Sequence, residues 1–239
     1  MKVIIPLAGK DKRFEEIGAY KPLIDINREP LIYHVITQNK LPKDNLHFII
    51  LDEHEDKYKA SENLKKWFGK SIHIYIVGEQ TLGAPNTILE IKDKINDDED
   101  IIIELADVVC QTNNLFEDIQ KIKDSKAIVP VDENYSADNW GYIIKKKGKI
   151  TELREKSPER LRGGATMGLY YFRKGSEFVK YAEEMIRKEK RIGLTNLYYV
   201  GPIVNEYIED NKKISTSENE IRYVLGSPEQ IEEFVKIEK

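Results

Sequence analysis

Four positively charged side chains lie just behind a short apolar run at the start of the chain. Residues 3–7, Val-Ile-Ile-Pro-Leu, predict a buried parallel strand that ends at Ala8-Gly9. The segment that follows carries the cations Lys10, Lys12, Arg13 and, one loop later, Lys21. A strand that ends in glycine and then offers backbone N–H groups and cations suits a polyphosphate. We therefore predict a triphosphate site at this turn.

A carboxylate, Asp107, follows the last of four apolar runs in the first half of the chain. These runs are residues 3–7, 48–51, 72–77 and 101–105, and segments with helical spacing lie between them. Such alternation predicts right-handed crossovers and a parallel sheet covered by helices on both faces. Sheets of this kind bind ligands at the carboxyl ends of their strands. We therefore expect residues 9–13, residues 78–83 and Asp107 at one rim.

The second half of the chain predicts antiparallel additions to this sheet. Residues 141–145 and 150–155 flank a turn at Lys147-Gly148 and indicate a β-hairpin, and residues 165–172 indicate another strand. A helix is predicted around residues 178–185. We expect an α/β fold with a Rossmann-like, mostly parallel central sheet, helices on both faces and antiparallel additions in the C-terminal half. Additions of this type commonly build an acceptor pocket over a nucleotide-binding half.

Two spacings predict where helices begin. Asn114 and Glu117 have the spacing of a capping box, in which a polar side chain closes the first turn of a helix. Ser227 and Gln230 have the same spacing, and Pro228 stands at the first helical position, where proline is favoured. We expect helices that start at both places.

Composition describes an ordinary globular protein and limits its partners. The 239 residues are 40% hydrophobic and 33% charged with a net charge of −4, which gives no overall attraction to nucleic acid or to an anionic membrane. No stretch approaches the roughly 20 apolar residues that span a bilayer, and the start lacks a signal-peptide pattern. One cysteine, Cys110, excludes an internal disulfide. We expect a cytoplasmic protein without nucleic-acid or membrane partners, and the sequence leaves homo-oligomerisation open.

Six segments occur in an order that carries a family resemblance. They are Ala8-Gly9-Lys-Asp-Lys-Arg13-Phe14 with Tyr20-Lys21-Pro22-Leu23, Thr81-Leu-Gly83-Ala-Pro-Asn-Thr87, Leu105-Ala-Asp107, Trp140-Gly141-Tyr142 with Glu155-Lys156, Ala165-Thr-Met-Gly168-Leu-Tyr170, and Leu225-Gly226-Ser-Pro228-Glu. Together they resemble the sugar nucleotidyltransferases, glycosyltransferase-A-like pyrophosphorylases that make nucleotide-activated sugars, and most of all a short subgroup among capsule and surface-polysaccharide enzymes. The resemblance implies one nucleotidyltransferase domain, residues 1–239, with a nucleotide-binding half to about residue 110 and an acceptor-binding half over 111–239.

The resemblance also implies a reaction and a set of site residues. A nucleoside triphosphate would react with a phosphorylated small molecule, most often a sugar 1-phosphate, and release pyrophosphate. The implied catalytic residues are Arg13 and Lys21 on the triphosphate and Asp107 on Mg²⁺. Nucleotide-binding positions would be Leu7, Ala8, Gly9, Lys10, Lys12, Arg13, Lys21, Gln80, Gly83, Ala84 and Ala106. Acceptor-binding positions would be Trp140, Gly141, Glu155, Lys156, Thr166 and Gly168, with Lys156 on the acceptor phosphate.

The chain departs from the family pattern at three positions. Asp11 stands where the family usually has its second glycine, and Tyr20 stands where it has a proline. Val224 stands where many relatives have a second metal-binding aspartate. An aspartate in a phosphate-binding loop adds a repelling charge, which the neighbouring lysines offset. For the second metal ligand, Glu218 or Glu220 is the alternative that we consider.

Three other functions stay open at this stage. They are a CTP-dependent cytidylyltransferase for a non-sugar phosphate, a glycosyltransferase of the same fold, and a catalytically weak nucleotide-binding regulatory module. Val108 and Val109 after Asp107 lack the Asp-x-Asp pattern usual in such glycosyltransferases. Pyrophosphate release separates the nucleotidyltransferases from the other two classes.

Overall fold

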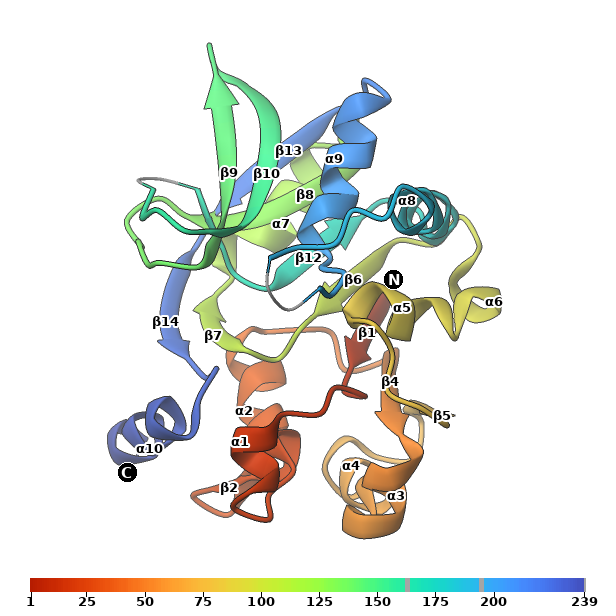
Figure 1. Ribbon diagram of the computed structural model, residues 1–239, viewed down its shortest axis with the longest axis vertical. Helices are drawn as coiled ribbons and strands as arrows, with labels where there is room; N and C mark the ends of the chain where they lie inside the picture. Colours follow the sequence, from red (N-terminus) through yellow and green to blue (C-terminus); the bar gives the residue numbers. More distant parts are fainter. Residues whose placement is uncertain (162–163, 194–195, 239) are drawn as a thin grey trace.

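The computed structural model describes residues 1–161, 164–193 and 196–238 (Figure 1). Its strands are β1 Lys2–Pro6, β2 Asp25–Ile26, β3 Glu29–Pro30, β4 Leu46–Leu51, β5 His73–Val77, β6 Ile101–Glu104, β7 Val108–Gln111, β8 Ala127–Asp132, β9 Trp140–Lys146, β10 Lys149–Ser157, β11 Ala165–Thr166, β12 Leu169–Phe172, β13 Ile214–Glu218 and β14 Glu220–Val224. Its helices are α1 Lys12–Glu15, α2 Leu31–Gln38, α3 Asp52–Tyr58, α4 Ala60–Phe68, α5 Ala84–Leu89, α6 Lys92–Ile95, α7 Asn113–Lys121, α8 Gly175–Arg187, α9 Gly201–Glu209 and α10 Pro228–Ile237, with a short 3₁₀ turn at Lys21–Leu23.

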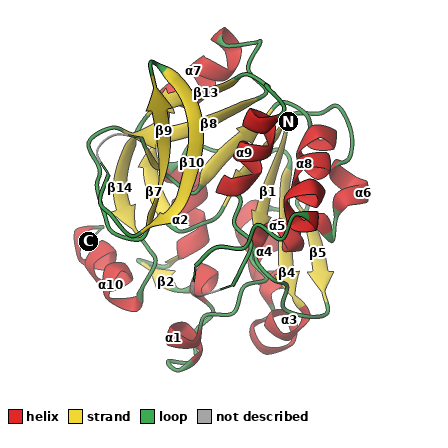
Figure 2. Cartoon of the chain, turned by 45° about the horizontal axis from the view of Figure 1, so that its top comes forward, coloured by secondary structure: helices red, strands yellow, loops and turns green. Residues whose placement is uncertain are grey.

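One large sheet runs through both halves of the chain in the order β10-β9-β11-β8-β12-β6-β1-β4-β5, and β13 pairs with β8. Strand β1 is parallel to β4 and β6, and β4 is parallel to β5. Strand β12 runs antiparallel to both β6 and β8, and the β9–β10 hairpin lies beyond them. Figure 2 shows β1, β4 and β5 on one side of the molecule and the hairpin on the other. The expected α/β fold, with a parallel core and antiparallel additions, is confirmed.

Two hydrophobic cores lie on opposite faces of this sheet. Because side chains alternate along a strand, Val3 and Ile5 of β1 enter one core while Ile4 enters the other. Helices α2, α4, α7 and α10 supply apolar residues to the first core, and α5, α8 and α9 supply them to the second. Figure 1 shows α8 and α9 on one side and α2 and α10 on the other. The apolar runs of β1, β4 and β6 are continuous because these strands are buried on both faces, whereas β5 lies at the sheet edge and is partly exposed.

The two halves of the chain meet where β6 ends. Register pairs Leu169 of β12 with Glu104 of β6, and the Leu105 N–H donates to the Gly168 carbonyl (3.0 Å). Since β12 is antiparallel to β6, the residues just before β12 reach the rim at which β6 ends. That rim therefore holds segments from both halves.

Two predictions of local structure are wrong. Residues 165–172 form two strands rather than one, because Gly168 takes a left-handed conformation (φ +70°) that interrupts the pleat. Helix α7 begins one residue before Asn114, with Thr112 as its cap residue and no capping side chain. The Asn114 amide instead donates to the Glu218 carbonyl (2.6 Å). At Ser227 the capping prediction is confirmed, since its hydroxyl accepts from the Gln230 N–H (3.4 Å).

Among the described residues, no helix is long and apolar enough to cross a membrane.

Candidate active site

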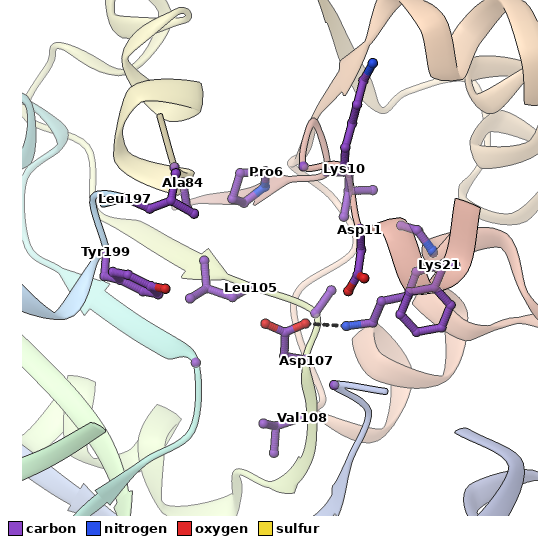
Figure 3. Close-up of a pocket in the computed structure, with 18 of the residues that line it drawn as sticks. Pro6, Lys10, Asp11, Lys21, Ala84, Leu105, Asp107, Val108, Leu197 and Tyr199 are labelled. Carbon is purple, nitrogen blue, oxygen red and sulfur yellow. Dashed lines mark hydrogen bonds and ion pairs between the residues drawn. The ribbon is translucent and has the colours of Figure 1, made fainter. Parts of the chain in front are cut away.

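A cavity of about 430 Å³ opens at the rim where β1 and β6 end. Small-molecule sites typically enclose about 300–1,000 Å³, so this cavity is large enough for one. Figure 3 shows side chains from β1, the turn after β6 and the segment before α9 around the same space. The cavity therefore draws its walls from segments far apart in the sequence.

Most of the predicted site residues line this cavity. They are Leu7, Gly9, Lys10, Lys21, Gly83, Ala84, Ala106 and Asp107 from the nucleotide set, and Trp140, Gly141, Glu155, Lys156, Thr166 and Gly168 from the acceptor set. Four of the predicted positions lie outside the lining: Ala8, Lys12, Arg13 and Gln80. Ala8 is buried in the second core, whereas the other three are exposed. Their part in binding stays a prediction.

The turn after β1 is held in place by an aromatic side chain that the sequence analysis noted only as a departure. Tyr20 is buried, and its hydroxyl donates to the Leu7 carbonyl (2.9 Å). Its ring stacks on Tyr58 at 5.5 Å and packs against His54 at 4.2 Å, both ring-centroid distances. Burial raises the pKa of the Tyr20 hydroxyl, so it stays protonated and remains a donor. Tyr20 therefore anchors the loop after β1 through its hydrogen bond to Leu7, which a proline at this position could not make.

Asp11 and Arg13 bind each other at the mouth of the cavity. Asp11 is the cap residue of α1, and its Oδ1 accepts from the Arg13 backbone N–H (3.1 Å) and from Nε (2.9 Å). Its Oδ2 accepts from an Arg13 terminal nitrogen (2.5 Å). These hydrogen bonds lower the pKa of the Asp11 carboxyl, which is therefore ionised at neutral pH. Arg13 remains 57% exposed, so its guanidinium stays in contact with water.

Lys21 and Asp107 form an ion pair inside the cavity (Figure 3). The Lys21 side chain is 16% exposed and comes from the 3₁₀ turn, whereas the Asp107 side chain is 56% exposed and comes from the turn after β6. The Leu225 N–H donates to the Asp107 carbonyl (2.7 Å) and holds that turn against β14. A carboxylate and an ammonium group thus face one open space. The ammonium suits a polyanionic substrate, and the carboxylate suits a metal cation.

A buried carboxyl group supports the turn that carries Asp107. Glu104, the last residue of β6, is fully buried, and its Oε1 accepts from the Ala106 N–H (2.8 Å). Its Oε2 accepts from the Asn39 amide (2.9 Å), and that amide also donates to the Val108 carbonyl (3.1 Å). Ala106 has φ +59°, a left-handed conformation that is rare for alanine. The hydrogen bonds at Glu104 and Asn39 hold the turn in this shape.

A close backbone contact shapes the side of the cavity at the start of α5. Gly83 has φ +122°, and a Cβ there would lie 2.1 Å from the Tyr198 carbonyl oxygen. The Tyr198 N–H donates to the Leu82 carbonyl (2.8 Å), so the two segments run side by side. Only glycine fits this position, because any side chain would displace the backbone of residue 198.

The acceptor side of the cavity is built on the β9–β10 hairpin and β11. The Trp140 indole N–H donates to the Thr166 carbonyl (2.7 Å), which holds the ring at the cavity wall. Burial raises the pKa of the Glu155 carboxyl, which also lines the cavity. Lys156 takes a left-handed conformation (φ +51°), and its ammonium lies 5.5 Å from the centre of the Tyr199 ring. This wall offers an aromatic face, a carboxyl group and a cation.

Sequence reasoning missed the wall formed by residues 197–200, which lies across the cavity from β1. Leu197, Tyr198, Tyr199 and Val200 all contribute to the lining. They precede α9 and reach the site through the contact at Gly83. The signal that could have found them is the aromatic pair Tyr198-Tyr199 just before Gly201-Pro202, a helix start.

The donor set of the cavity suits a magnesium ion that shares its coordination with substrate phosphates. Among the described residues, no group of three or more His, Cys, Asp or Glu side chains could enclose a metal by itself. Mg²⁺ is commonly bound by one or two carboxylates together with phosphate oxygens and water, and Asp107 is a carboxylate in the cavity. Glu218 and Glu220 line a separate cavity with Asp132 and Asn219, so neither reaches Asp107 as a second ligand.

A comparison with protein families now decides the class. A model of the family described as nucleotidyl transferase matches residues 2–215. The chain belongs to this family.

Individual relatives of this nucleotidyltransferase share its fold at low sequence identity. The bifunctional protein GlmU of Methanocaldococcus jannaschii is 27% identical over 194 residues, which are 80% of this chain and 43% of that protein. The chain thus spans less than half the length of this curated relative. A nucleoside-diphosphate-sugar pyrophosphorylase from Vibrio cholerae superimposes with a TM-score of 0.81 at 20% identity, over 98% of this chain and 99% of that one. A UDP-glucose pyrophosphorylase complexed with UDP-glucose superimposes with a TM-score of 0.72 at 19% identity, over 99% and 97%.

Proposed function

We propose that the protein joins a nucleoside triphosphate to a phosphorylated small metabolite, a sugar 1-phosphate before others, and releases pyrophosphate. The observation that carries the proposal is the Lys21–Asp107 ion pair in a cavity lined by both halves of the chain. Two of the solved structures named above support it, because by name they are a nucleoside-diphosphate-sugar pyrophosphorylase and a UDP-glucose pyrophosphorylase. From the subgroup resemblance, we extend the proposal to an activated precursor for surface polysaccharide made in the cytoplasm.

The chemistry that we propose needs no side chain to remove a proton. The attacking oxygen belongs to a phosphate monoester, whose second pKa is about 6, so it is largely ionised at pH 7. The difficulty is electrostatic, because two unit charges 4 Å apart repel by about 4 kcal/mol at an effective dielectric constant of 20. Fixed positive charges in the cavity are therefore the main contribution of the protein.

Each charged group in or beside the cavity has a proposed task. Lys21 and Arg13 contact the triphosphate and stabilise the charge on the leaving pyrophosphate. Lys156 contacts the acceptor phosphate from the opposite wall, which positions the attacking oxygen. Asp107 would hold Mg²⁺, and the bound ion would supply positive charge for the phosphate oxygens. When the substrates and the metal ion bind, Lys21 would leave Asp107 and pair with a phosphate group instead.

The test is a grid of substrates. Purified protein is mixed with each of the common nucleoside triphosphates and with a panel of sugar and non-sugar phosphates, and pyrophosphate is detected through a coupled pyrophosphatase. We expect pyrophosphate only when a triphosphate and one class of phosphorylated acceptor are both present. A response limited to CTP with a non-sugar phosphate would replace the sugar acceptor by the cytidylyltransferase alternative. Consumption of a nucleotide sugar without pyrophosphate would favour a glycosyltransferase and contradict the proposal.

A further inference from the structure

We propose that Asp11 is the second carboxylate ligand of the divalent cation, acting with Asp107 across the cavity in place of the carboxylate that Val224 lacks. The inference rests on the proposed function, because it concerns the cation of the same site. It assigns a task to the residue that departs most from the phosphate-loop pattern of the family.

The placement of three charged groups supports this assignment. Asp11, Lys21 and Asp107 all line the same cavity. Figure 3 shows the Asp11 carboxylate pointing toward the Lys21 ammonium, which Asp107 approaches from another direction. After the hydrogen bonds from Arg13, the Lys21 charge is a further contribution to the lowered pKa of Asp11. The Lys21 ammonium thus acts on both carboxylates, since it forms an ion pair with Asp107 and contributes to the lowered pKa of Asp11 through its charge alone.

Asp11 keeps a free coordination position despite its contact with Arg13. A carboxylate offers about four lone-pair sites. Oδ1 accepts two hydrogen bonds from Arg13, and Oδ2 accepts one. One lone pair of Oδ2 is left for a cation, while the bonds at Oδ1 keep the carboxylate oriented. Arg13 then acts as a positioning residue, as hydrogen-bonded partners of metal ligands commonly do.

The position that Asp11 would replace lies beside Asp107 in this structure. Strand β14 pairs with β7 in a register that sets Val224 opposite Val108, and Val224 lines the cavity. The hydrogen bond from Leu225 N to the Asp107 carbonyl fixes this neighbour relation. An apolar side chain there leaves Asp107 with no second carboxylate on its own side. Asp11 lines the same cavity from the loop after β1.

The charges also balance. Two carboxylates carry a charge of −2, which Lys21 and Arg13 neutralise in the free protein through their ion pairs. A divalent cation can take over that neutralisation, and Lys21 is then available to a phosphate group. The Asp11 charge would thus attract the cation rather than repel the triphosphate.

The test measures metal binding directly, without turnover. Mn²⁺ is the probe, and free Mn²⁺ is followed by electron paramagnetic resonance during titration of the full chain and its variants. Asp11→Asn removes the charge but keeps an amide oxygen that can cap α1, so the loop keeps its cap. Asp124→Asn is the matched control, because Asp124 is an exposed carboxylate paired with Lys213 outside the cavity lining.

We expect Asp11→Asn and Asp107→Asn each to weaken Mn²⁺ binding by at least about 10-fold, with Asp124→Asn unchanged. If Asp107→Asn weakens binding and Asp11→Asn does not, the inference about Asp11 is wrong and the proposed function stands. If neither variant changes Mn²⁺ binding, both the inference and the metal role in the proposed function fail.

A second pair of variants tests the shared ion. Asp11→Gly restores the family glycine and should bind Mn²⁺ as weakly as Asp11→Asn. Adding Val224→Asp to Asp11→Gly should return the affinity to within a few fold of the wild type, because a carboxylate again stands beside Asp107. Affinity that stays as low as in Asp11→Gly would contradict a cation shared between Asp11 and Asp107.

Discussion

Lys21 and Asp107 lie 86 residues apart in the sequence, and each is the other's charged partner in the cavity. The Lys21 side chain is 16% exposed and lines the cavity, so its ammonium is placed to meet another anion there when Asp107 is engaged elsewhere. A phosphate group would supply the missing counter-charge. At the scale of single residues, the site is therefore organised for an exchange of partners.

Removal of either charge should lower the rate without unfolding the protein. Lys21→Ala takes away a cation that would stabilise the leaving pyrophosphate, and Asp107→Asn takes away a ligand of the cation. We expect each variant to lower kcat by roughly 10²–10³-fold, as loss of preorganised charge stabilisation does elsewhere. The measurement is steady-state pyrophosphate release with the substrate pair found in the grid.

The control for these variants is their far-ultraviolet circular dichroism and melting temperature. The spectra should match that of the wild type, and the melting temperatures should lie within a few degrees of it, since neither side chain belongs to a hydrophobic core. A variant that is folded and as active as the wild type would remove its residue from the mechanism.

Gly83 offers a prediction about backbone packing. In Gly83→Ala the new methyl group must displace the Tyr198 carbonyl, and φ +122° is unfavourable for alanine. We expect a loss of about 1–3 kcal/mol in the free energy of unfolding, measured by urea titration. Gly78→Ala is the matched control, because a Cβ there meets nothing within 4 Å. Equal stability of the two variants would contradict the tight contact at Gly83.

At the scale of elements, strand β6 delivers the turn that carries Asp107, and it ends in the buried Glu104. Burial raises the pKa of this carboxyl to about 8 from its ordinary value of 4.5. The folded protein therefore holds a proton at Glu104 that the unfolded chain releases at a lower pH. Between about pH 4.5 and 8 the folded state binds more protons than the unfolded state.

The contribution of Glu104 to the free energy of unfolding should consequently fall as pH rises through that range. The contribution of Glu104 declines by at most about 1.4 kcal/mol per pH unit. Glu104→Gln mimics the protonated acid and cannot ionise. The free energy of unfolding of the variant, relative to that of the wild type, should therefore increase from pH 5 to pH 8. Melting temperatures of both proteins across this range provide the measurement. Parallel pH profiles would show that Glu104 is ionised in the folded protein.

Elements were predictable from the sequence where one physical signal determined them. The apolar runs identified β1, β4, β5 and β6 to within two residues. For β1, β4 and β6 the reason is burial on both faces, which requires a continuously apolar strand, whereas β5 is apolar although it lies partly exposed at the sheet edge. Strands β13 and β14 were missed, since Ile-Ser-Thr-Ser-Glu and Glu-Ile-Arg-Tyr-Val are too short and polar to stand out. They form only because β8 and β7 offer them an edge.

At the scale of the whole molecule, the site lies at the rim of the sheet where the parallel strands of the first half meet the antiparallel strands of the second half. Residues 9–13, residues 78–83 and Asp107 were predicted at one rim. Gly9, Lys10, Asp11, Gly83 and Asp107 line the cavity there, whereas Lys12, Arg13 and residues 78–82 lie outside its lining. The aromatic pair Tyr198-Tyr199 could have drawn attention to residues 197–200, but their place in the cavity wall and the anchoring role of Tyr20 each depend on a contact between distant segments, which the sequence does not show. Asp11 and Arg13 are two residues apart, so their ion pair could be expected from the sequence. The sequence could not show whether that pair belongs to a binding site or is an ordinary surface ion pair.

The central claim is that this one cavity brings a triphosphate and a phosphorylated acceptor together for direct displacement of pyrophosphate. Exchange of labelled pyrophosphate into the nucleoside triphosphate tests that claim most directly. We predict rapid exchange in the wild type only when the acceptor phosphate is present, and exchange slowed by roughly 10²–10³-fold in Lys21→Ala. Exchange that needs no acceptor, or that proceeds at the wild-type rate in Lys21→Ala, would contradict it.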